Sequence, residues 1–362
     1  LENTRRYLSE SATAGATSAG NVATLNRVIL PVIRRVMPTV IANELVGVQP
    51  MTGPVGQIHT LRVRYSDTND ATNTLNDVTA GDEALSPFKI AEAYSGDGTA
   101  GKAASTAALE GAAGRKMSIQ ILKQTVEAKT RKLSARWTFE AAQDAQSMHG
   151  IDVEAEIMAA LAQEITAEID QEVLGSLQTL AGTGSQTYNQ AAVSGTATFV
   201  GDEHAALAVQ INRVSNLIAQ RTRRGAGNWA VVSPLALTIL QSATTSAFAR
   251  TTEGTFEAPT NTKMVGTLNN AMKVYVNTYA ADDAPVLIGY KGASESDAAA
   301  FYCPYIPLMS SGVVLDPGTF EPTVSFMTRY GYVELNNTAS SLGNAADYLG
   351  RVEITDGNVS FS

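Results

Sequence analysis

The sequence predicts an α+β protein with more than one lobe. Its 362 residues exceed a typical single domain, and a hydrophobic fraction of 44% with a charged fraction of 17% is typical of a chain that folds. A row of apolar residues spaced by four between residues 157 and 177 predicts one long helix. After residue 229, short apolar runs alternate with loops, which predicts strands in mixed or antiparallel sheets with one more helix.

The first 25 residues predict an extended N-terminal arm. Ser, Thr and Gly are interleaved with Ala there, so the segment has little apolar surface to bury. We expect such an arm to become ordered only against a neighbouring molecule. The chain starts with Leu1 and not Met, which is typical of either a fragment or a proteolytically trimmed product, and composition does not distinguish the two.

Residues 25–48 carry apolar residues at helical intervals, but Pro31 and Pro38 divide the pattern into short pieces. The alternation from Ile58 to Tyr65 predicts a half-exposed strand with His59 on its surface. The following stretch, up to Lys116, is rich in Asp, Asn, Thr, Gly and Ala, and is too long for a structureless connection inside a compact domain.

This stretch predicts a long projecting loop or hairpin. Ordering a residue costs about 1–2 kcal/mol of backbone entropy, and the stretch offers little apolar area to offset that cost. We therefore expect another molecule to hold it in place.

A helix is expected from Ala135 to Met148, ending at His149-Gly150, because glycine commonly follows a helix C-terminus. Asp152 is expected to cap the next helix, which would run about 40 Å to Leu180 at 1.5 Å per residue. An apolar row spaced by four winds around such a helix, so it should form a spine that meets more than one partner.

A further helix is predicted from Glu203 to Arg223, with Arg221, Arg223 and Arg224 at its C-terminus. Later elements are expected at Trp229–Val232, a helix from Pro234, Lys273–Asn277, Val286–Tyr290, Ala299–Cys303 and Val324–Val333.

The composition disfavours several functions. A net charge of −9 and a pI near 5.0 disfavour tight binding to phosphate backbones. If a nucleic acid is nearby, we expect the protein to enclose it without binding it tightly. The single cysteine, Cys303, lies in an apolar run and is expected to be buried, and the three histidines, His59, His149 and His204, are widely separated. No apolar run is long enough for a membrane span.

Three weak motifs do not predict a nucleotide site, a calcium site or an acid–base pair. Gly96–Ala103 has the spacing of a phosphate-binding loop, but Ala103 replaces the Ser or Thr that ligates magnesium. Asp67–Asp70 are similar to the start of a calcium-binding loop, but the next two residues are neither a ligand nor the required glycine. A solvated turn is therefore favoured. The acidic helix face at 154–172 is favoured as a solvated or inter-subunit face. The sequence thus predicts no catalytic, cofactor-binding or metal-binding residues.

Several segments, in order along the chain, together resemble the major capsid proteins of T-even-like contractile-tailed phages. They are Leu45–Pro54, Glu127–Leu133, Phe139–Asp144 with His149-Gly150, Glu164–Val173, Val274–Val276, Gly289–Ala293 with Asp297, Pro304-Tyr305 and Thr328–Gly331.

The resemblance implies an HK97-like fold of α+β class. It divides the chain into an N-terminal arm (1–25), the start of a peripheral domain (26–65), an extended loop (66–118), a peripheral domain with the spine helix (119–190), an axial domain (191–318) and a return to the peripheral domain with the C-terminus (319–362). By this resemblance, the segment between Tyr65 and Lys116 looks too short for the extra insertion domain that the larger members carry there.

The function implied is that of a major capsid protein. It would form hexameric capsomers of an icosahedral or prolate head around double-stranded DNA, after a protease removes an N-terminal segment. Implied partners are other copies of the chain, vertex, portal and decoration proteins, and, during assembly in the host cytoplasm, a scaffold and the prohead protease. Cofactors and membranes are not implied.

Candidate inter-subunit contacts are the basic residues Arg5, Arg6, Lys102, Arg115, Lys116, Arg221, Arg223 and Arg224. Other hypotheses are a pentameric vertex paralogue or a nanocompartment shell, which copy number would distinguish. A nucleotide-dependent enzyme using Lys102 and a surface-layer or adhesin protein are more remote.

Overall fold

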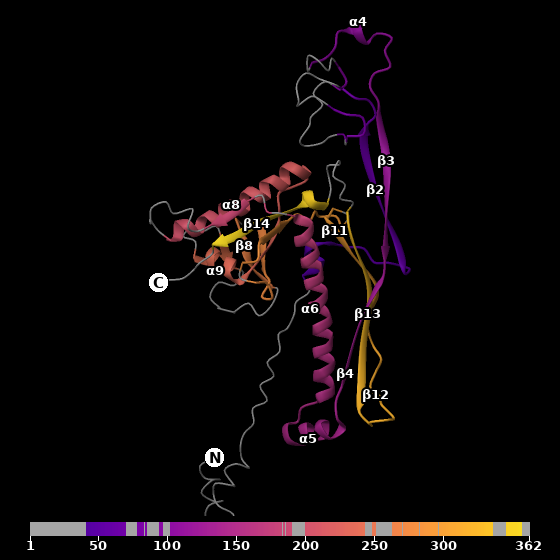
Figure 1. Cartoon of the computed structure of the whole chain (residues 1–362), viewed down its shortest axis with the longest axis vertical. Helices are drawn as coiled ribbons and strands as arrows, with labels where there is room; N and C mark the ends of the chain where they lie inside the picture. The colour runs from indigo at the N-terminus through magenta and orange to yellow at the C-terminus, as the bar shows by residue number, and fades with distance from the viewer. Residues whose placement is uncertain are drawn as a thin grey trace, which may run out of the picture.

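The computed structural model describes residues 41–69, 78–82, 84, 94–96, 102–182, 184, 186–189, 200–242, 248–250, 263–269, 271–281, 283–295, 297–335 and 345–356. The predicted arm, with Arg5 and Arg6, lies outside these residues. The described part has three regions: a lobe built on a seven-stranded sheet, an elongated lobe built along helix α6, and a projecting hairpin (Figure 1).

The sheet lobe contains strands β5 (Gln186–Asn189), β14 (Leu349–Asp356), β10 (Val286–Gly289), β6 (Trp229–Val232), β9 (Met272–Val276), β8 (Lys263–Leu268) and β7 (Phe248–Arg250), in that spatial order. Pairs β5–β14 and β6–β9 are parallel and the others are antiparallel. Helices α8 (Val200–Thr222) and α9 (Pro234–Ser242) pack on this sheet. Their apolar sides form the largest core with β6, β9 and β10.

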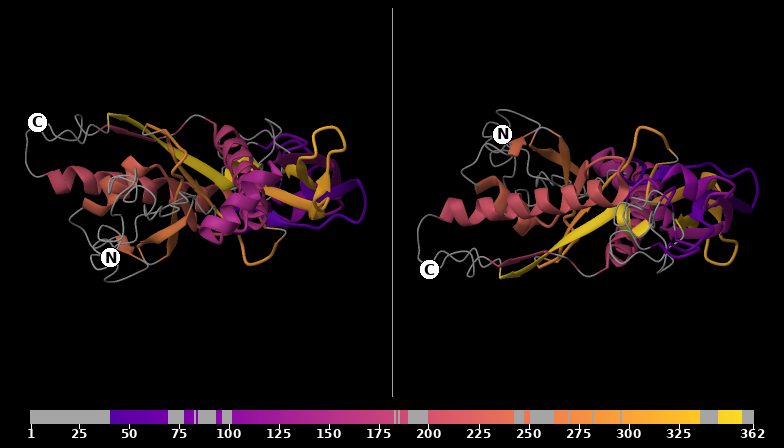
Figure 2. Two further views of the ribbon diagram at one scale, coloured as in Figure 1. Left: turned by 90° about the horizontal axis from the view of Figure 1, so that it is seen from below. Right: turned by 90° about the horizontal axis from the view of Figure 1, so that it is seen from above.

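The spine lobe consists of α5 (Phe139–His149), α6 (Val153–Ala181) and a second sheet. In this sheet β13 (Pro322–Glu334) pairs with β11 (Ala300–Ser310), β12 (Val314–Leu315) and β4 (Lys129–Arg136), and β1 (Gly47–Val48) pairs with β11. The short helices α3 (Ala42–Leu45) and η1 (Ala345–Tyr348) lie where the two lobes meet. Seen along the long axis, the sheet lobe lies to one side of the spine lobe (Figure 2).

Helix α6 confirms the predicted spine. The side chain of Asp152 caps it, since its Oδ1 accepts hydrogen bonds from the backbone N–H of Glu154 at 3.1 Å and of Ala155 at 3.4 Å. Its first half buries Leu161 and Ile165 against β13, and its second half packs in the core of the sheet lobe. The winding apolar row therefore joins two separate cores, as predicted.

Residues 41–48 are fixed at the junction by polar contacts. The backbone N–H of Ile41 donates to Asp170 of α6 at 3.3 Å. Lys291 Nζ donates to the carbonyl oxygen of Asn43 at 2.7 Å, and Glu295 accepts from the N–H of Val48 at 2.9 Å. Lys291, from the Gly289–Ala293 segment of the family resemblance, and nearby Glu295 thus hold residues 41–48 at the junction of the two lobes.

The helix predicted to start at Ala135 starts at Phe139. Ala135 and Arg136 are instead in β4, opposite Val324 and Thr323 of β13. Residues 129–136 form the strand β4 only because they pair with β13, which lies far along the chain. The sequence pattern alone did not predict this pairing. The predicted end at His149-Gly150 is confirmed, since Gly150 has φ 64.

The two sheets divide the chain differently from the predicted segments. β11, placed in the axial segment 191–318, belongs to the spine sheet with β13. Conversely, β5 and β14, placed in the peripheral segments 119–190 and 319–362, belong to the sheet lobe, because β14 pairs with β10 and β5 with β14. The projecting hairpin likewise extends beyond the predicted loop 66–118 on both sides.

An ion-pair cluster holds the middle of α6 on the spine sheet. Arg131 of β4 donates to Glu168 and Glu172, on successive turns of α6, at 2.5 Å each. Tyr330 of β13 donates to Glu172 at 2.5 Å and accepts from Arg131 Nε at 2.6 Å. Partial burial opposes ionisation of Glu172, but the hydrogen bonds from Arg131 and Tyr330 outweigh it and hold its pKa below the ordinary value.

We expect Glu172→Gln to lower the free energy of unfolding by about 1–2 kcal/mol at pH 7, because it weakens charge-assisted hydrogen bonds in a partly exposed cluster. The lowered pKa means that Glu172 contributes its full stabilisation above pH 4.5, its ordinary value, and loses it as pH falls through the folded-state pKa. The variant should therefore lose less stability than wild type on acidification.

Urea denaturation at a series of pH values from 7 down to 3 measures this difference. The control is Glu164→Gln, which changes an exposed glutamate on the same helix. Equal acid sensitivity in the wild type and Glu172→Gln would contradict the assignment.

Candidate assembly surface

The projecting hairpin is formed by β2 (Val55–Tyr65) and β3 (Met117–Glu127). The two strands pair antiparallel without a bulge from Val55↔Glu127 to Tyr65↔Met117. They form a two-stranded sheet that rises away from both lobes, with the short helix α4 (Thr106–Leu109) beyond its end (Figure 1). Most of its length therefore gains no support from a third strand.

One face of the hairpin exposes large apolar side chains. Leu61 lies opposite Ile121, and Ile119 is two residues along the same strand, so all three share one face. Their exposed fractions are 64%, 66% and 67%, and Met117 on the same face is also exposed. Contiguous exposed apolar residues of this kind mark an interaction surface.

The far end of the hairpin has a small core of its own. The ring of Tyr94 packs against Tyr65 with centroids 4.5 Å apart, and Val78 and Ala84 are buried beside them. The Tyr94 hydroxyl donates to the carbonyl oxygen of Lys116 at 2.5 Å and accepts from the N–H of Asp67 at 3.1 Å. These contacts fix the strand ends where the loop begins.

Three predicted contact residues are at this end. The Arg115 guanidinium donates to the carbonyl oxygens of Tyr94 and Gly96 at 3.0 and 3.2 Å and lies 5.8 Å from the centre of the Tyr94 ring. The backbone N–H of Lys116 donates to Asp67 at 2.6 Å, and Lys102 is exposed. Arg115 thus has a role inside the subunit, and contacts of all three with a neighbour remain a prediction.

The hairpin is attached to the spine lobe at its base. Val126 of β3 packs with Phe301 and Cys303 of β11, and a Cβ at Gly331 of β13 would clash with Val126. Cys303 is buried, as predicted, and burial raises the pKa of its thiol. Gly331, part of the Thr328–Gly331 segment, is required here because β3 crosses it closely.

The other predicted contact residues are in the sheet lobe. Arg221 lies in the last turn of α8, Arg223 follows the helix with φ 50, and Arg224 pairs with Asp297 at 2.7 Å. Asp297 also accepts from the Tyr348 hydroxyl at 3.4 Å. Among the described residues, the basic candidates therefore fall into one group at the far end of the hairpin and another in the sheet lobe, and Arg224 has a partner within its own chain.

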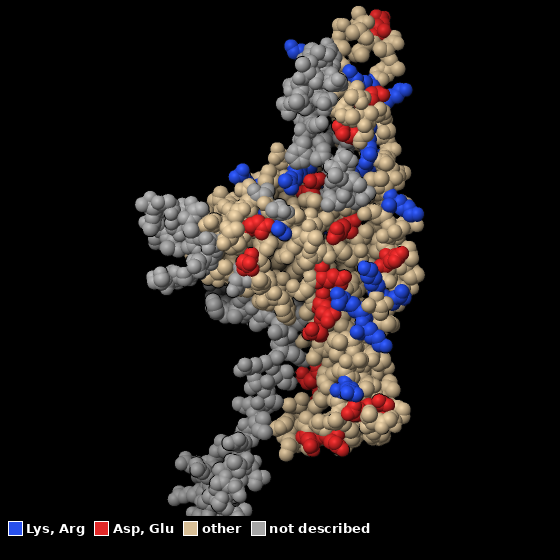
Figure 3. Space-filling view, viewed as in Figure 1, with Lys and Arg blue, Asp and Glu red and all other residues tan. Residues whose placement is uncertain are grey.

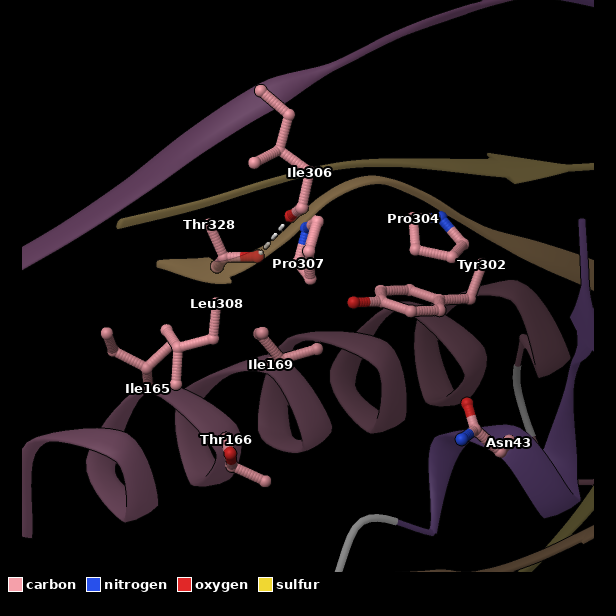
Figure 4. A pocket seen from close by; sticks show the side chains of 10 residues that line it. All are labelled: Asn43, Ile165, Thr166, Ile169, Tyr302, Pro304, Ile306, Pro307, Leu308 and Thr328. Atoms are coloured by element: carbon pink, nitrogen blue, oxygen red, sulfur yellow. Dashed lines mark hydrogen bonds between the residues drawn. The ribbon is translucent and has the colours of Figure 1, made fainter. Parts of the chain in front are cut away.

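A cavity of about 210 Å³ lies between α6 and the spine sheet (Figure 4). It is lined by Asn43, Ile165, Thr166, Ile169, Tyr302, Pro304, Ile306, Pro307, Leu308 and Thr328. No lining residue is charged, and the volume is below that of typical ligand pockets, about 300–1,000 Å³. The lining offers no acid, base or nucleophile pair.

The described residues contain no group of three His, Cys, Asp or Glu side chains placed to hold a metal ion. The histidines lie apart: His59 is exposed on β2, His149 ends α5, and buried His204 hydrogen-bonds with Ser242. Across the described ranges, no helix is long and apolar enough to cross a membrane. A phosphate-binding loop that includes Lys102 would lead into a helix. In the described chain just after Lys102, the helix present is α4, which has four residues and none buried.

Sequence reasoning missed the exposed apolar face of the hairpin. The signal was the alternation Met117-Ser118-Ile119-Gln120-Ile121, which predicts a strand with one apolar face. Its exposure could not be read from the sequence, because the same pattern describes a strand with its apolar face in a core.

The chain matches a protein-family model described as "Major capsid protein Gp23" over residues 22–354. It is 29% identical to the major capsid protein of Vibrio phage KVP40, over 92% of this chain and 81% of that protein. It is 30% identical to the major capsid protein of Enterobacteria phage T4, over 94% and 80%. These alignments span 430 and 433 positions, more than the 362 residues of the chain, so both relatives contain residues that it lacks.

Solved structures are similar over nearly the whole chain. A chain from Mycobacterium phage Bobi matches with a TM-score of 0.57 and 14% identity, over 94% of this chain and 99% of that one. The capsid of Myoviridae phage XM1 matches with a TM-score of 0.52 and 10% identity, over 94% and 100%. At these identities the likeness shows the fold alone, and it confirms the predicted HK97-like fold.

We expect Gly331→Ala to lower the free energy of unfolding by about 1–3 kcal/mol, because the added methyl group overpacks against Val126. It should also increase amide hydrogen exchange in β3 near Val126. Combining it with Val126→Ala should recover part of the loss, which a double-mutant cycle of urea denaturation would measure. Gly53→Ala is the control, since its Cβ would meet no atom closer than 3.9 Å; equal losses in both variants would contradict the close approach.

Proposed function

The chain belongs to the Gp23 family of major capsid proteins, and from this we propose that it forms hexameric capsomers of a phage head that encloses double-stranded DNA. It is a structural component of the virion shell, as the T-even-like resemblance predicted. Its relatives have structural roles and not enzymatic ones. The proposal therefore concerns how copies of the chain contact one another.

The exposed apolar face of the hairpin carries the proposal. Leu61, Ile119 and Ile121 are on a two-stranded sheet that gains little from the rest of its own chain. Burying one such side chain stabilises by about 1.5–3 kcal/mol, so a neighbour that covers this face would stabilise both the hairpin and the contact. We propose that each hairpin lies on the adjacent subunit of the capsomer.

Charge favours the spine of the neighbour as the surface that is covered. The hairpin carries the basic residue Lys123 within β3, Lys116 at its far end and Lys102 beyond that end. Acidic side chains gather along α6 on the face seen in Figure 3. Glu168 and Glu172 pair with Arg131 of the same chain, and exposed Glu154 and Glu164 lie outside that cluster. Opposite charges on the two surfaces would orient the subunits as they meet.

Further parts of the proposal rest on the family. A protease would remove an N-terminal segment during maturation, with a scaffold present and assembly in the host cytoplasm. Vertex, portal and decoration proteins would complete the particle. The net charge of −9 supports enclosure of DNA without specific binding to it.

We expect the double variant Ile119→Thr/Ile121→Thr to assemble less well while its subunit folds normally. Threonine keeps the β-branched shape that suits a strand, and both positions are exposed, so the free energy of unfolding should change by less than about 1 kcal/mol. The fraction of protein in capsomers or shells, measured by sedimentation and electron microscopy, should fall several-fold.

The control is Gln57→Thr, which changes an exposed residue of β2 on the same face of the hairpin. Unchanged assembly of the double variant would refute the role of this face, and a strictly monomeric wild type at high concentration would refute the proposed function.

Charge reversal tests the basic contact residues. We expect Arg5→Glu/Arg6→Glu and Arg221→Glu to reduce assembly yield and particle heat stability, because each would repel acidic groups on a neighbour. Arg224→Glu is unsuitable alone, since it also breaks the internal pair with Asp297. Normal yield and an unchanged melting temperature of the particles would show that these residues face solvent.

A further inference from the structure

Strand β11 of the spine sheet is irregular where it passes α6. Pro304 and Pro307 have no backbone N–H to donate to a neighbouring strand. The register with β13 shifts between Pro304 and Ile306 and again between Ile306 and Met309. Shifts of this kind interrupt the hydrogen-bond ladder and bend the strand. The cavity of about 210 Å³ lies at this interruption, between β11 and the middle turns of α6 (Figure 4).

The cavity is mainly apolar. Its apolar lining consists of Ile165, Ile169, Ile306, Leu308 and the two prolines. Apolar cavities of about 150 Å³ in proteins stay free of water and bind molecules as small as benzene. The space therefore suits a molecule with a single ring, although it is smaller than a pocket for a drug-sized ligand.

Tyr302 presents a hydrogen-bond donor to this apolar space. Its hydroxyl points into the cavity and forms no hydrogen bond with the other lining residues (Figure 4). The hydroxyls of the two lining threonines are already bonded. Thr328 Oγ1 donates to the carbonyl oxygen of Ile306 at 3.0 Å, and Thr166 Oγ1 donates to a backbone carbonyl of its own helix at 2.8 Å. The Tyr302 hydroxyl is thus the donor that is left for a ligand.

The charges around the cavity favour a neutral ligand. Burial raises the pKa of the Tyr302 hydroxyl, and the nearby carboxylates of Asp170 and Glu172 raise it further, so the hydroxyl keeps its proton and donates. An anion would find no basic residue in the lining and would lie near Asp170. Asn43, which is exposed at the edge of the cavity, is uncharged as well. The lining therefore matches a neutral molecule that accepts one hydrogen bond.

We propose that this cavity binds a small neutral amphiphile, with an apolar body the size of one ring and a hydrogen-bond acceptor that receives the Tyr302 hydroxyl. Such a ligand would contact α6 and the spine sheet together, close to the point where the apolar row of α6 changes cores. Because it binds the folded chain, it would stabilise the subunit. The inference goes beyond the proposed function, since the cavity is formed by one chain and does not require assembly.

Benzyl alcohol is the probe, because it combines one ring with one hydroxyl. We expect it to bind the dissociated full-length chain with a dissociation constant of about 1 mM, measured by ligand-detected NMR. At about ten times that concentration it should raise the melting temperature by about 2 °C. Benzoate, which has a similar size and a negative charge, should neither bind nor change the melting temperature.

Two variants locate the site. Ile169→Phe fills the cavity from α6, so it should abolish binding of benzyl alcohol. Tyr302→Phe removes the hydroxyl and keeps the ring, so it should weaken benzyl alcohol binding by about fivefold and leave toluene binding unchanged. Its own melting temperature should not fall, because no hydrogen bond to the lining is lost. The matched control is Tyr305→Phe, which removes a hydroxyl from the same strand outside the cavity.

The inference would be overturned if benzyl alcohol failed to bind the wild type, or if it bound both Ile169→Phe and Tyr302→Phe as tightly as the wild type. An equal loss of affinity in Tyr302→Phe and Tyr305→Phe would also overturn it. Binding that disappears when shells form would assign the cavity to a side chain of a neighbouring copy, against the inference. These results leave the proposed function standing, because that function fails only if the wild-type chain does not assemble.

Discussion

The architecture depends on the way the apolar row of α6 turns around its helix. Residues spaced by four advance about 40° per step, so a single row cannot face one partner over the full length of the helix. The first half, with Leu161 and Ile165, faces the spine sheet, and the second half, with Val173 and Leu177, faces the sheet lobe. One continuous helix thereby contributes to both cores and fixes the relation between them.

Several polar contacts of α6 lie where the apolar row changes partner. Asp170 is buried there and accepts from Ile41, while Glu168 and Glu172 face Arg131 on the other side of the helix. The cavity of about 210 Å³ lies beside the same turns, next to Ile165 and Ile169. Between the two cores, the apolar residues of α6 do not fill the space between the helix and the spine sheet. Directional bonds at this point hold the helix where packing is incomplete.

The features predicted correctly from the sequence are those set by local chemistry. The Asp152 cap, the glycine end of α5 and the row along α6 each depend on residues within a few turns. The strand β4 was missed because Lys129–Arg136 is mostly polar and forms a strand only against β13. The exchange of β11 and β14 between the predicted segments has the same origin, since sheet membership is decided by partners far along the chain. Arg115 and Arg224 were predicted as contacts with neighbours from their charge alone, and their partners in the fold, Tyr94 and Asp297, could not be read from spacing.

The distribution of burial follows from this arrangement. The cores that stabilise the subunit are in the middle of its long axis, around α6 and the seven-stranded sheet, and most of the exposed large apolar residues are in the hairpin and near α5 and β12. A hairpin of two strands and the helix α5, which has no buried residues, contribute little to the stability of a single subunit. Substitutions at the two ends should therefore change association with little effect on folding, whereas substitutions at the junction change folding first. In the proposed shell, neighbours that cover the ends add stabilisation that a single subunit does not supply there.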